Sequence, residues 1–403
     1  MGPAGEPYPG WVTTAALSTG LLQASPSGIR EIYNAAATMP DAIRLEAGQP
    51  DFRTPDHVVE AAKRALDDGW HGYTPTAGLA SLRERLAAKL GRVNGIHVEP
   101  GQVVSGVGGV GVLSAAMAAL VDPGDEVLLP DPGWPNVGLM VAMLHGRMVP
   151  YACPPELAFR PDLDRLEALI TPRTKVLVVN SPNNPTGAVY PPGTLRALGE
   201  LAERRGLWLL SDECYDQIVL EGEGVAPSLA NFADPDRVIS AFTFSKSYAM
   251  TGWRLGYACA TPQVVDTMVK VLEANTSCPS TISQKAGEAA LDGPQDCVAS
   301  MVTAYRRRRD LVVELLQEAG LLLSTPTGAF YILANVAPSG LDSRAFALRL
   351  LERREVAVAP GGAFGQVADG AVRISLASSE EHLREGVGRL CEMVTDLATP
   401  PQY

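Results

Sequence analysis

The sequence predicts an α/β protein in which a mostly parallel sheet is sandwiched by helices, followed by a smaller α+β domain. Three observations predict this fold: short segments that are apolar at every position, amphipathic segments between them, and a change of this rhythm near residue 300. Strands that are apolar on both faces are typical of a parallel sheet covered by helices. The chain has 403 residues, which is enough for two domains.

Helical and strand-like segments alternate along the first three quarters of the chain. Apolar residues at helical spacing predict helices, and short continuous apolar runs predict strands. The predicted helices are 58–69 (VVEAAKRALDDG), 79–93 and 195–206, and the predicted strands are 126–130 (EVLLP), 174–180 (TKVLVVN), 207–213 and 237–245.

The last hundred residues carry a different pattern, in which a long helix leads to short strands and a closing helix. The predicted helices are 297–320 and 380–397, and the predicted strands are 329–336, 356–360 and 371–377. Residues 1 to about 25 are rich in Gly, Pro and Ser and are expected to form an arm. We therefore expect the arm and part of the small domain in 1–45, a large domain in 46–300 and a C-terminal small domain in 301–403.

The composition excludes several classes of function. The formal net charge of −12 argues against nucleic acid and anionic membranes as partners. The first residues lack a basic start followed by an apolar core, and no apolar run reaches membrane-spanning length, so we expect a cytoplasmic protein. The six cysteines form no C-x-x-C pair and the five histidines no H-x-x-x-H set, so no metal site or disulfide framework is expected.

A glycine-rich stretch, VVSGVGGVGVLSAAM (103–117), raises the question of a phosphate-binding loop. Gly106, Gly108 and Gly111 fit the spacing G-x-G-x-x-G between an apolar run and an Ala-rich helical stretch. Asp131 follows 20 residues after Gly111, where a dinucleotide-binding fold places the acid that binds a ribose. The stretch could therefore bind NAD or FAD, or a different phosphate.

Polar residues follow four of the predicted strands, where ligands of open parallel sheets bind. The segments are PDPGWPN (130–136), NSPNNPTG (180–187), SDECYD (211–216) and SKSYAMTGWR (245–254). Each alone has a commoner structural explanation, such as a turn, a helix cap or a surface lysine. Together they supply what pyridoxal 5'-phosphate (PLP) needs: a lysine for a Schiff base, an aspartate for the pyridine nitrogen, a stacking tryptophan and a phosphate-binding arginine.

From about residue 25 to 395 the chain resembles the class I aminotransferases of PLP fold type I, the aspartate aminotransferase superfamily. Motifs of that family occur here in the family's order. They are SPSGIREI, LEAGQPDF, YTPTAGLASLRERLA, DPGWPN, NSPNNPTG, SDECYD, TFSKSYAMTGWRLGY, GAFYI, VAVAPGGAFG and VRISLASSEEHL. The resemblance implies a PLP-binding large domain and a homodimer with shared active sites.

The resemblance also implies roles for the residues that hold the cofactor ring. Lys246 would form the Schiff base and then move a proton between the substrate's α-carbon and the cofactor. Asp212 would pair with the pyridine nitrogen. Tyr215 and Asn184 would hold the phenolic oxygen, and Trp134 would lie over the ring.

Further positions match residues that bind the phosphate and the substrate. Arg254, Ser245, Thr243 and the backbone at Gly109 and Val110 would bind the phosphate at a helix N-terminus, which makes PLP the expected phosphate of the glycine-rich stretch. Tyr73 would reach the phosphate bound in the partner subunit's active site. Arg373 would pair with the substrate α-carboxylate, assisted by Asn184 and the backbone at Gly48.

Val110 departs from the family's usual residues at this position, and this affects which substrate is expected. Many relatives have Thr, Ser or Lys here, and valine can neither bond the phosphate through a hydroxyl nor bind a second carboxylate. The segment 271–284 contains no Lys or Arg, although acid-specific relatives supply an arginine from that region. A buried carboxylate without a partner is costly, so we expect a substrate with a neutral side chain, aliphatic or aromatic.

The expected reaction is ping-pong transfer of an amino group between an L-amino acid and a 2-oxo acid. The closest alternative is a PLP-dependent lyase, synthase or oxidase, because the same lysine serves those reactions on the same fold. A PLP-binding regulator would need a DNA-binding domain ahead of this fold, and the short arm does not supply one. An NAD-dependent enzyme is the remote alternative, and it leaves Lys246, Asp212 and Arg373 without a role.

Overall fold

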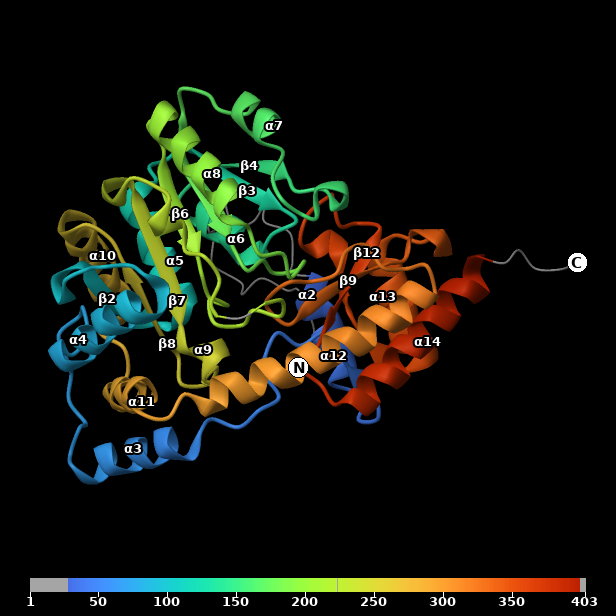
Figure 1. Cartoon of the computed structure of the whole chain (residues 1–403), viewed down its shortest axis with the longest axis horizontal. Helices are drawn as coiled ribbons and strands as arrows, with labels where there is room; N and C mark the ends of the chain where they lie inside the picture. The colour runs from blue at the N-terminus through green and yellow to red at the C-terminus, as the bar shows by residue number, and fades with distance from the viewer. Residues whose placement is uncertain (1–27, 223, 399–403) are drawn as a thin grey trace, which may run out of the picture.

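The computed structural model describes residues 28–222 and 224–398. The arm expected before residue 25 lies outside these residues. Figure 1 shows a large α/β unit built on one sheet, beside a smaller unit that contains the C-terminal helix. This confirms the predicted fold class, while the domain boundaries near 45 and 300 stay a prediction.

The large unit is built on a seven-stranded sheet in the order β2-β8-β7-β6-β5-β3-β4. Its strands are β2 (Val103–Val107), β3 (Glu126–Asp131), β4 (Arg147–Ala152), β5 (Thr174–Asn180), β6 (Trp208–Asp212), β7 (Val238–Thr243) and β8 (Leu255–Cys259). Only β8 runs antiparallel to its neighbours within this sheet. The four strands predicted before residue 300 are β3, β5, β6 and β7, so the prediction from apolar runs is confirmed.

Helices cover both faces of this sheet, which explains why its strands are apolar at successive positions. Val176 and Val178 of β5 pack on one face with α5, whereas Leu177 and Val179 pack on the other face with α8. The helices are α3 (Asp56–Asp67), α4 (Ala80–Lys89), α5 (Gly108–Leu120), α6 (Pro135–Met143), α7 (Leu163–Ala168), α8 (Pro192–Arg205), α9 (Phe244–Ser247), α10 (Pro262–Thr276) and α11 (Thr281–Asp292).

The predicted helix over 79–93 ends differently from the expectation. It continues from α4 into a π-helical turn, Leu90–Asn94, that stops at Gly95 with φ of 70°. At this junction the Lys89 side chain is buried and forms an ion pair with Asp216. Glycine adopts positive φ without steric cost, so Gly95 can end the helix there.

The smaller unit combines a three-stranded antiparallel sheet, in the order β11-β12-β9, with a two-stranded parallel one. The strands are β1 (Ile43–Arg44), which pairs with β10 (Val356–Ala357), and β9 (Tyr331–Asn335), β11 (Ala359–Pro360) and β12 (Ala371–Ser375). Its helices are α2 (Gly28–Ala36), α12 (Asp296–Glu318), α13 (Ser343–Arg354) and α14 (Glu380–Ala398). The single strand predicted over 356–360 is two short strands that join different sheets.

Two features connect the units. In Figure 1, α12 runs lengthwise from beside α11 to α14. Asp131, at the end of β3, accepts backbone N–H bonds from Gln366 and Val367 at 3.1 and 3.0 Å.

Among the described helices, none is both long enough and apolar enough to cross a membrane.

Candidate active site

The candidate site lies beyond the carboxyl ends of β5, β6 and β7, as expected for an open parallel sheet. Lys246 lies in α9, the single helical turn that follows β7. Its Nζ donates a hydrogen bond to the Gly48 carbonyl at 2.6 Å and lies 5.8 Å from the centre of the Tyr215 ring. The lysine therefore connects the sheet of the large unit to the segment that follows β1.

Asp212, the last residue of β6, is 4% exposed. Its carboxylate accepts the backbone N–H of Cys214 at 3.2 Å. Burial raises the pKa of Asp212, and the nearby charge of Lys246 acts in the opposite direction. A cation placed against this carboxylate would offset the cost of burying it, as a protonated pyridine nitrogen does.

The N-terminus of α5 approaches the sheet closely because glycines leave room for it. Gly108 has φ of 73°, and a Cβ there would lie 2.5 Å from Nη2 of Arg254. A Cβ on Gly256 of β8 would lie 2.4 Å from the Gly108 carbonyl carbon. No side chain caps the first turn of this 13-residue helix, so its N–H groups are available to an anion.

The other predicted phosphate contacts lie close to this helix end. Thr243 Oγ1 donates to Ser245 Oγ at 2.9 Å, and Arg254 Nη1 donates to the Thr251 carbonyl at 2.7 Å. A Cβ on Gly109 would lie 3.4 Å from the Thr243 Cβ. Val110, in the same turn of α5, is half-buried against the apolar core beneath the sheet.

The glycine spacing therefore serves the contact between α5 and β8. A dinucleotide fold would place the strand before the loop inside a parallel set, but β2 is an edge strand paired antiparallel with β8. The Asp131 carboxylate is occupied by the backbone at Gln366 and Val367. The structure thus gives no support to the NAD alternative.

Arg373, in β12, is buried at 2% exposure and reaches across to the large unit. Its Nη1 donates to Asn184 Oδ1 at 2.9 Å, and its Nη2 donates to the Glu46 carbonyl at 2.6 Å. Nε has no hydrogen-bond partner among the described residues. Burial lowers the pKa of Arg373 from its usual value, and the nearby Tyr331, Tyr215 and Glu46 act in the opposite direction. An anion beside the guanidinium would satisfy both the charge and the unpaired N–H.

Tyr331 is a site residue to which the sequence analysis assigned no role, although it lies in the quoted motif GAFYI. Its hydroxyl is 3.0 Å from that of Tyr215, and its ring centre is 4.3 Å from the Arg373 guanidinium carbon. A Cβ on Gly48 would lie 2.9 Å from the Tyr331 hydroxyl. The motif could have flagged this tyrosine, but only the fold places it between Gly48, Tyr215 and Arg373.

Two predicted residues lie at the margins of the site. Trp134 immediately precedes α6 and lines a cavity of about 870 Å³ together with Gly48 and Asn136. Tyr73 is 91% exposed and is not brought to the site of its own chain.

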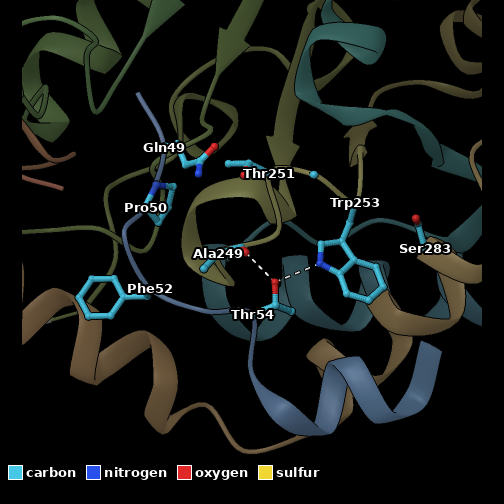
Figure 2. A pocket seen from close by; sticks show the side chains of 9 residues that line it. Gln49, Pro50, Phe52, Thr54, Ala249, Thr251, Trp253 and Ser283 are labelled. Carbon is cyan, nitrogen blue, oxygen red and sulfur yellow. Dashed lines mark hydrogen bonds between the residues drawn. The ribbon is translucent and has the colours of Figure 1, made fainter. Parts of the chain in front are cut away.

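A second cavity, of about 380 Å³, lies where the segment after Gly48 meets the loop after Lys246 (Figure 2). Thr54 joins the two: its hydroxyl donates to the Ala249 carbonyl at 2.8 Å and accepts from Trp253 Nε1 at 3.0 Å. These bonds attach the loop that follows Lys246 to the segment that follows Gly48.

The residues present fit PLP. Asp212 is a buried carboxylate, and its burial raises its pKa. The uncapped end of α5 lies beside Arg254, which suits a phosphate. Lys246 lies between these features and Gly48, within reach of an aldehyde held there. The family resemblance predicts a PLP enzyme of fold type I, and the geometry of these residues agrees with that prediction.

Comparisons with known proteins point to one family. The sequence model of the family described as aminotransferase class I and II matches residues 40–390. The chain is 44% identical to an aspartate/prephenate aminotransferase of Thermus thermophilus over 88% of this chain and 91% of the relative. It is 38% identical to aromatic-amino-acid aminotransferase 2 of Thermococcus litoralis, over 93% of this chain and 97% of the relative.

Solved structures give the same result. A Thermus thermophilus aspartate aminotransferase with maleate superposes with a TM-score of 0.89 at 43% identity, covering 94% of this chain and 100% of that one. An aromatic aminotransferase from Pyrococcus horikoshii superposes with a TM-score of 0.85 at 36% identity, covering 91% and 99%.

Proposed function

The chain belongs to the class I and II aminotransferases and is a PLP-dependent transaminase, and we propose that it runs a ping-pong cycle with an aromatic L-amino acid as the first donor. The observation that supports the proposal is the convergence of three side chains on one site: Asp212 from the end of β6, Lys246 from the turn after β7, and Arg373 from β12 of the smaller unit. When bound, PLP draws electrons from the substrate's α-carbon and so makes its proton removable.

In this proposal the residues of the large unit hold the cofactor. Lys246 would hold the cofactor through Nζ and, once freed from it, would carry the proton from the substrate's α-carbon. The Asp212 carboxylate keeps the pyridine nitrogen protonated. The remaining contacts are Tyr215 and Asn184 to the phenolic oxygen, Trp134 to the ring face, and Arg254, Ser245, Thr243 and the N–H groups of Gly109 and Val110 to the phosphate.

Arg373 binds the α-carboxylate of the substrate in this proposal. Its guanidinium is already oriented by Asn184 and by the Glu46 carbonyl, and its Nε is the donor left for a ligand. Because both amino-acid and 2-oxo-acid substrates carry this carboxylate, one arginine serves both halves of the cycle. The backbone N–H of Gly48 helps to bind the carboxylate in this proposal, whereas the Gly48 carbonyl accepts the hydrogen bond of Lys246 Nζ in this structure.

The donor class rests on the side of the site that binds the substrate side chain. Val110 supplies no cation, and the segment 271–284 contains no Lys or Arg. The relatives compared above act, by their names, on aspartate, prephenate or aromatic amino acids. The aliphatic half of the sequence-based expectation is therefore dropped, and the aromatic half is kept.

Aspartate is the second candidate donor. The relatives named for aspartate favour it, and Arg30 and Arg44 place positive charge on the wall of the larger cavity, although Arg44 is already paired with Glu46. Single-turnover conversion of the cofactor to its amino form, followed by absorbance with L-phenylalanine, L-tyrosine and L-aspartate, decides between them. The proposal expects the aromatic donors to react fastest, and faster conversion with aspartate would overturn it.

We also propose that the active enzyme is a homodimer. Tyr73 is 91% exposed in the single chain, in a loop that the family resemblance places at the partner's phosphate site. Mixing an inactive Lys246→Ala chain with an inactive Tyr73→Ala chain under conditions of subunit exchange tests this. Recovery of activity in the mixture is expected, because one of the two sites then carries both residues from intact chains.

A further inference from the structure

The larger cavity is lined by residues of both units and is connected to the reacting lysine through Gly48. Gly48, on its wall, accepts the hydrogen bond of Lys246 Nζ. Its volume is about 870 Å³, which is enough for an amino-acid side chain. The wall is formed by Ile29, Arg30, Tyr33, Arg44, Glu46–Asp51, Trp134, Asn136, Ala377–Ser379 and His382.

Glu46 is the unusual member of this wall, because it is a carboxylate that is only 1% exposed. Its Oε1 accepts from Arg44 Nε at 2.7 Å and from Arg44 Nη2. Its Oε2 is buried and has no hydrogen-bond partner among the described residues. A buried acceptor without a donor is costly and rare in native proteins, and a ligand that supplies the donor removes the cost.

The backbone of the same residue ties this acceptor to the substrate. The Glu46 carbonyl accepts from Nη2 of Arg373, the arginine assigned to the α-carboxylate. The position of Glu46 is therefore fixed relative to that arginine. A substrate held by Arg373 would therefore lie next to Glu46, which also lines the cavity.

We propose that Glu46 is a specificity residue whose Oε2 accepts a hydrogen bond from a neutral donor at the end of an aromatic substrate side chain, such as a phenolic hydroxyl. This deepens the proposed function and rests on it. Ile29, Tyr33 and Trp134 offer the apolar surface that a ring needs. Arg44 already balances the charge of Glu46, and Arg30 lies on the same wall, so a second cation from the substrate gains little there.

The competing explanation is that Glu46 serves only Arg373. Its negative charge raises the pKa of that guanidinium, and a loss of this effect would weaken the binding of every substrate carboxylate. Such a role changes all substrates by the same factor. Only a hydrogen bond to the side chain changes the ratio between a hydroxylated and an unsubstituted ring.

The test compares L-tyrosine with L-phenylalanine as donors of the PLP-loaded enzyme, in the wild type and in Glu46→Met. We expect the wild type to prefer tyrosine in kcat/KM by roughly ten- to a hundredfold, and Glu46→Met to lose that preference. Glu31→Met is the matched control, because Glu31 pairs with Arg344 on the surface and outside the cavity. It should keep the wild-type ratio.

Binding gives a second readout that does not depend on turnover. The dissociation constants of 3-(4-hydroxyphenyl)propionate and 3-phenylpropionate, which lack the amino group, should show the same preference in the wild type and none in Glu46→Met. Equal affinities in the wild type would overturn the inference even where the variant fails to fold. A ratio that Glu46→Met leaves unchanged, or faster turnover of L-lysine than of L-tyrosine, would overturn it as well.

Failure of the proposed function gives a different result. If no amino acid converts the cofactor to its amino form, the transaminase cycle itself is wrong. If L-aspartate alone does so, the aromatic donor class is wrong and the role of Glu46 falls with it. If both aromatic donors react equally well, only the role of Glu46 is wrong.

Discussion

The two sides of the active site are built in different ways. The cofactor cradle, formed by Gly108, Asp212, Thr243, Lys246 and Arg254, comes from the ends of neighbouring strands of one sheet and the helix that starts beside them. The substrate wall is formed by Glu46, Gly48, Asn184, Tyr331 and Arg373, which come from both units and lie as far as 327 residues apart in the chain. One side is set by the topology of a single sheet, and the other by how the two units pack.

The two sides also differ in how completely their polar atoms are paired. Among the described residues, the buried side-chain atoms without partners include Glu46 Oε2 and Arg373 Nε of the substrate wall, and none from the cofactor cradle. Unpaired buried atoms cost stability unless a ligand satisfies them. The comparison teaches that the substrate wall holds buried polar atoms whose hydrogen bonds a ligand would complete, whereas no buried unpaired side-chain atom of the described residues belongs to the cradle.

The largest effect is expected from the cradle. Replacing Lys246 with alanine removes both the covalent attachment and the proton carrier, so kcat for amino transfer should fall by on the order of 10⁴-fold. Steady-state turnover and the visible spectrum of the PLP-loaded protein measure this. Lys175→Ala is the control, because Lys175 pairs with Asp122 and Asp125 at the surface. Substantial residual activity in Lys246→Ala would remove the lysine from the proposed mechanism.

The next effect is expected from the substrate wall. Arg373→Lys keeps the charge but loses the planar fork that Asn184 and the Glu46 carbonyl orient, and breaking a buried hydrogen-bonded pair costs about 2–5 kcal/mol. We expect kcat/KM to fall by a corresponding roughly thirty- to several thousandfold, with PLP retention unchanged. A variant that loses PLP instead would show that the two sides of the site are not separate.

A third prediction concerns Glu213, the buried residue that follows Asp212. No contact with the cofactor or the substrate is assigned to its side chain. Burial raises its pKa to about 7, against the hydrogen bonds it receives from serines, of which Ser228 Oγ lies at 2.8 Å. The folded chain therefore holds a proton that the unfolded chain releases above about pH 4.5. The stability from this group is complete below that pH and is lost as the pH rises through 7.

The shift from 4.5 to about 7 corresponds to about 3 kcal/mol. Glu213→Gln keeps a neutral side chain at every pH, so the loss of unfolding free energy between pH 5 and pH 8 should shrink by about that amount. Denaturant unfolding of the PLP-free protein at both pH values measures it. Glu156→Gln, an exposed position, is the control, and an equal pH effect in Glu213→Gln and the wild type would contradict the prediction.

The smallest effect is expected at Val110. Val110→Thr places a hydroxyl in the first turn of α5, where it can bond the phosphate and contribute about 0.5–1.5 kcal/mol. The dissociation constant of PLP should fall by roughly two- to tenfold, while the ratio of kcat/KM between L-tyrosine and L-phenylalanine stays the same. A change of that ratio would mean that this turn also contacts the substrate side chain.

Most of the cradle could be predicted from the sequence. Apolar runs located β3, β5, β6 and β7, and the polar residues just beyond them, Asp212 and Lys246, were selected because strand ends are where parallel sheets bind ligands. The family resemblance, confirmed by the match over residues 40–390, added Arg373 and Asn184. Tyr331 and Glu46 lie in the matched motifs GAFYI and LEAGQPDF, but no role came with those motifs, and only their burial and contacts in the fold single them out.

The spacing of the glycines alone did not decide which phosphate the glycine-rich stretch binds. The spacing of Gly106, Gly108 and Gly111 is compatible with a dinucleotide loop as well as with this one, and spacing cannot tell an edge strand from a central strand. The family resemblance favoured PLP, and the strand order agrees with it: β2 pairs with β8, which returns antiparallel from the segment that carries Arg254. That pairing is non-local, so no local pattern records it.

What the sequence determined by itself is therefore the local part of this protein: the strands, most helices, the residues at the strand ends, and the family to which they belong. These follow from side-chain periodicity and from the order of motifs, which are properties of neighbouring residues. The tertiary structure alone decided which carboxylate of the substrate wall is buried with an oxygen unpaired, and that Tyr331 lies between Gly48 and Arg373. Burial and pairing across two packed units depend on residues hundreds of positions apart, and only folding brings those residues together.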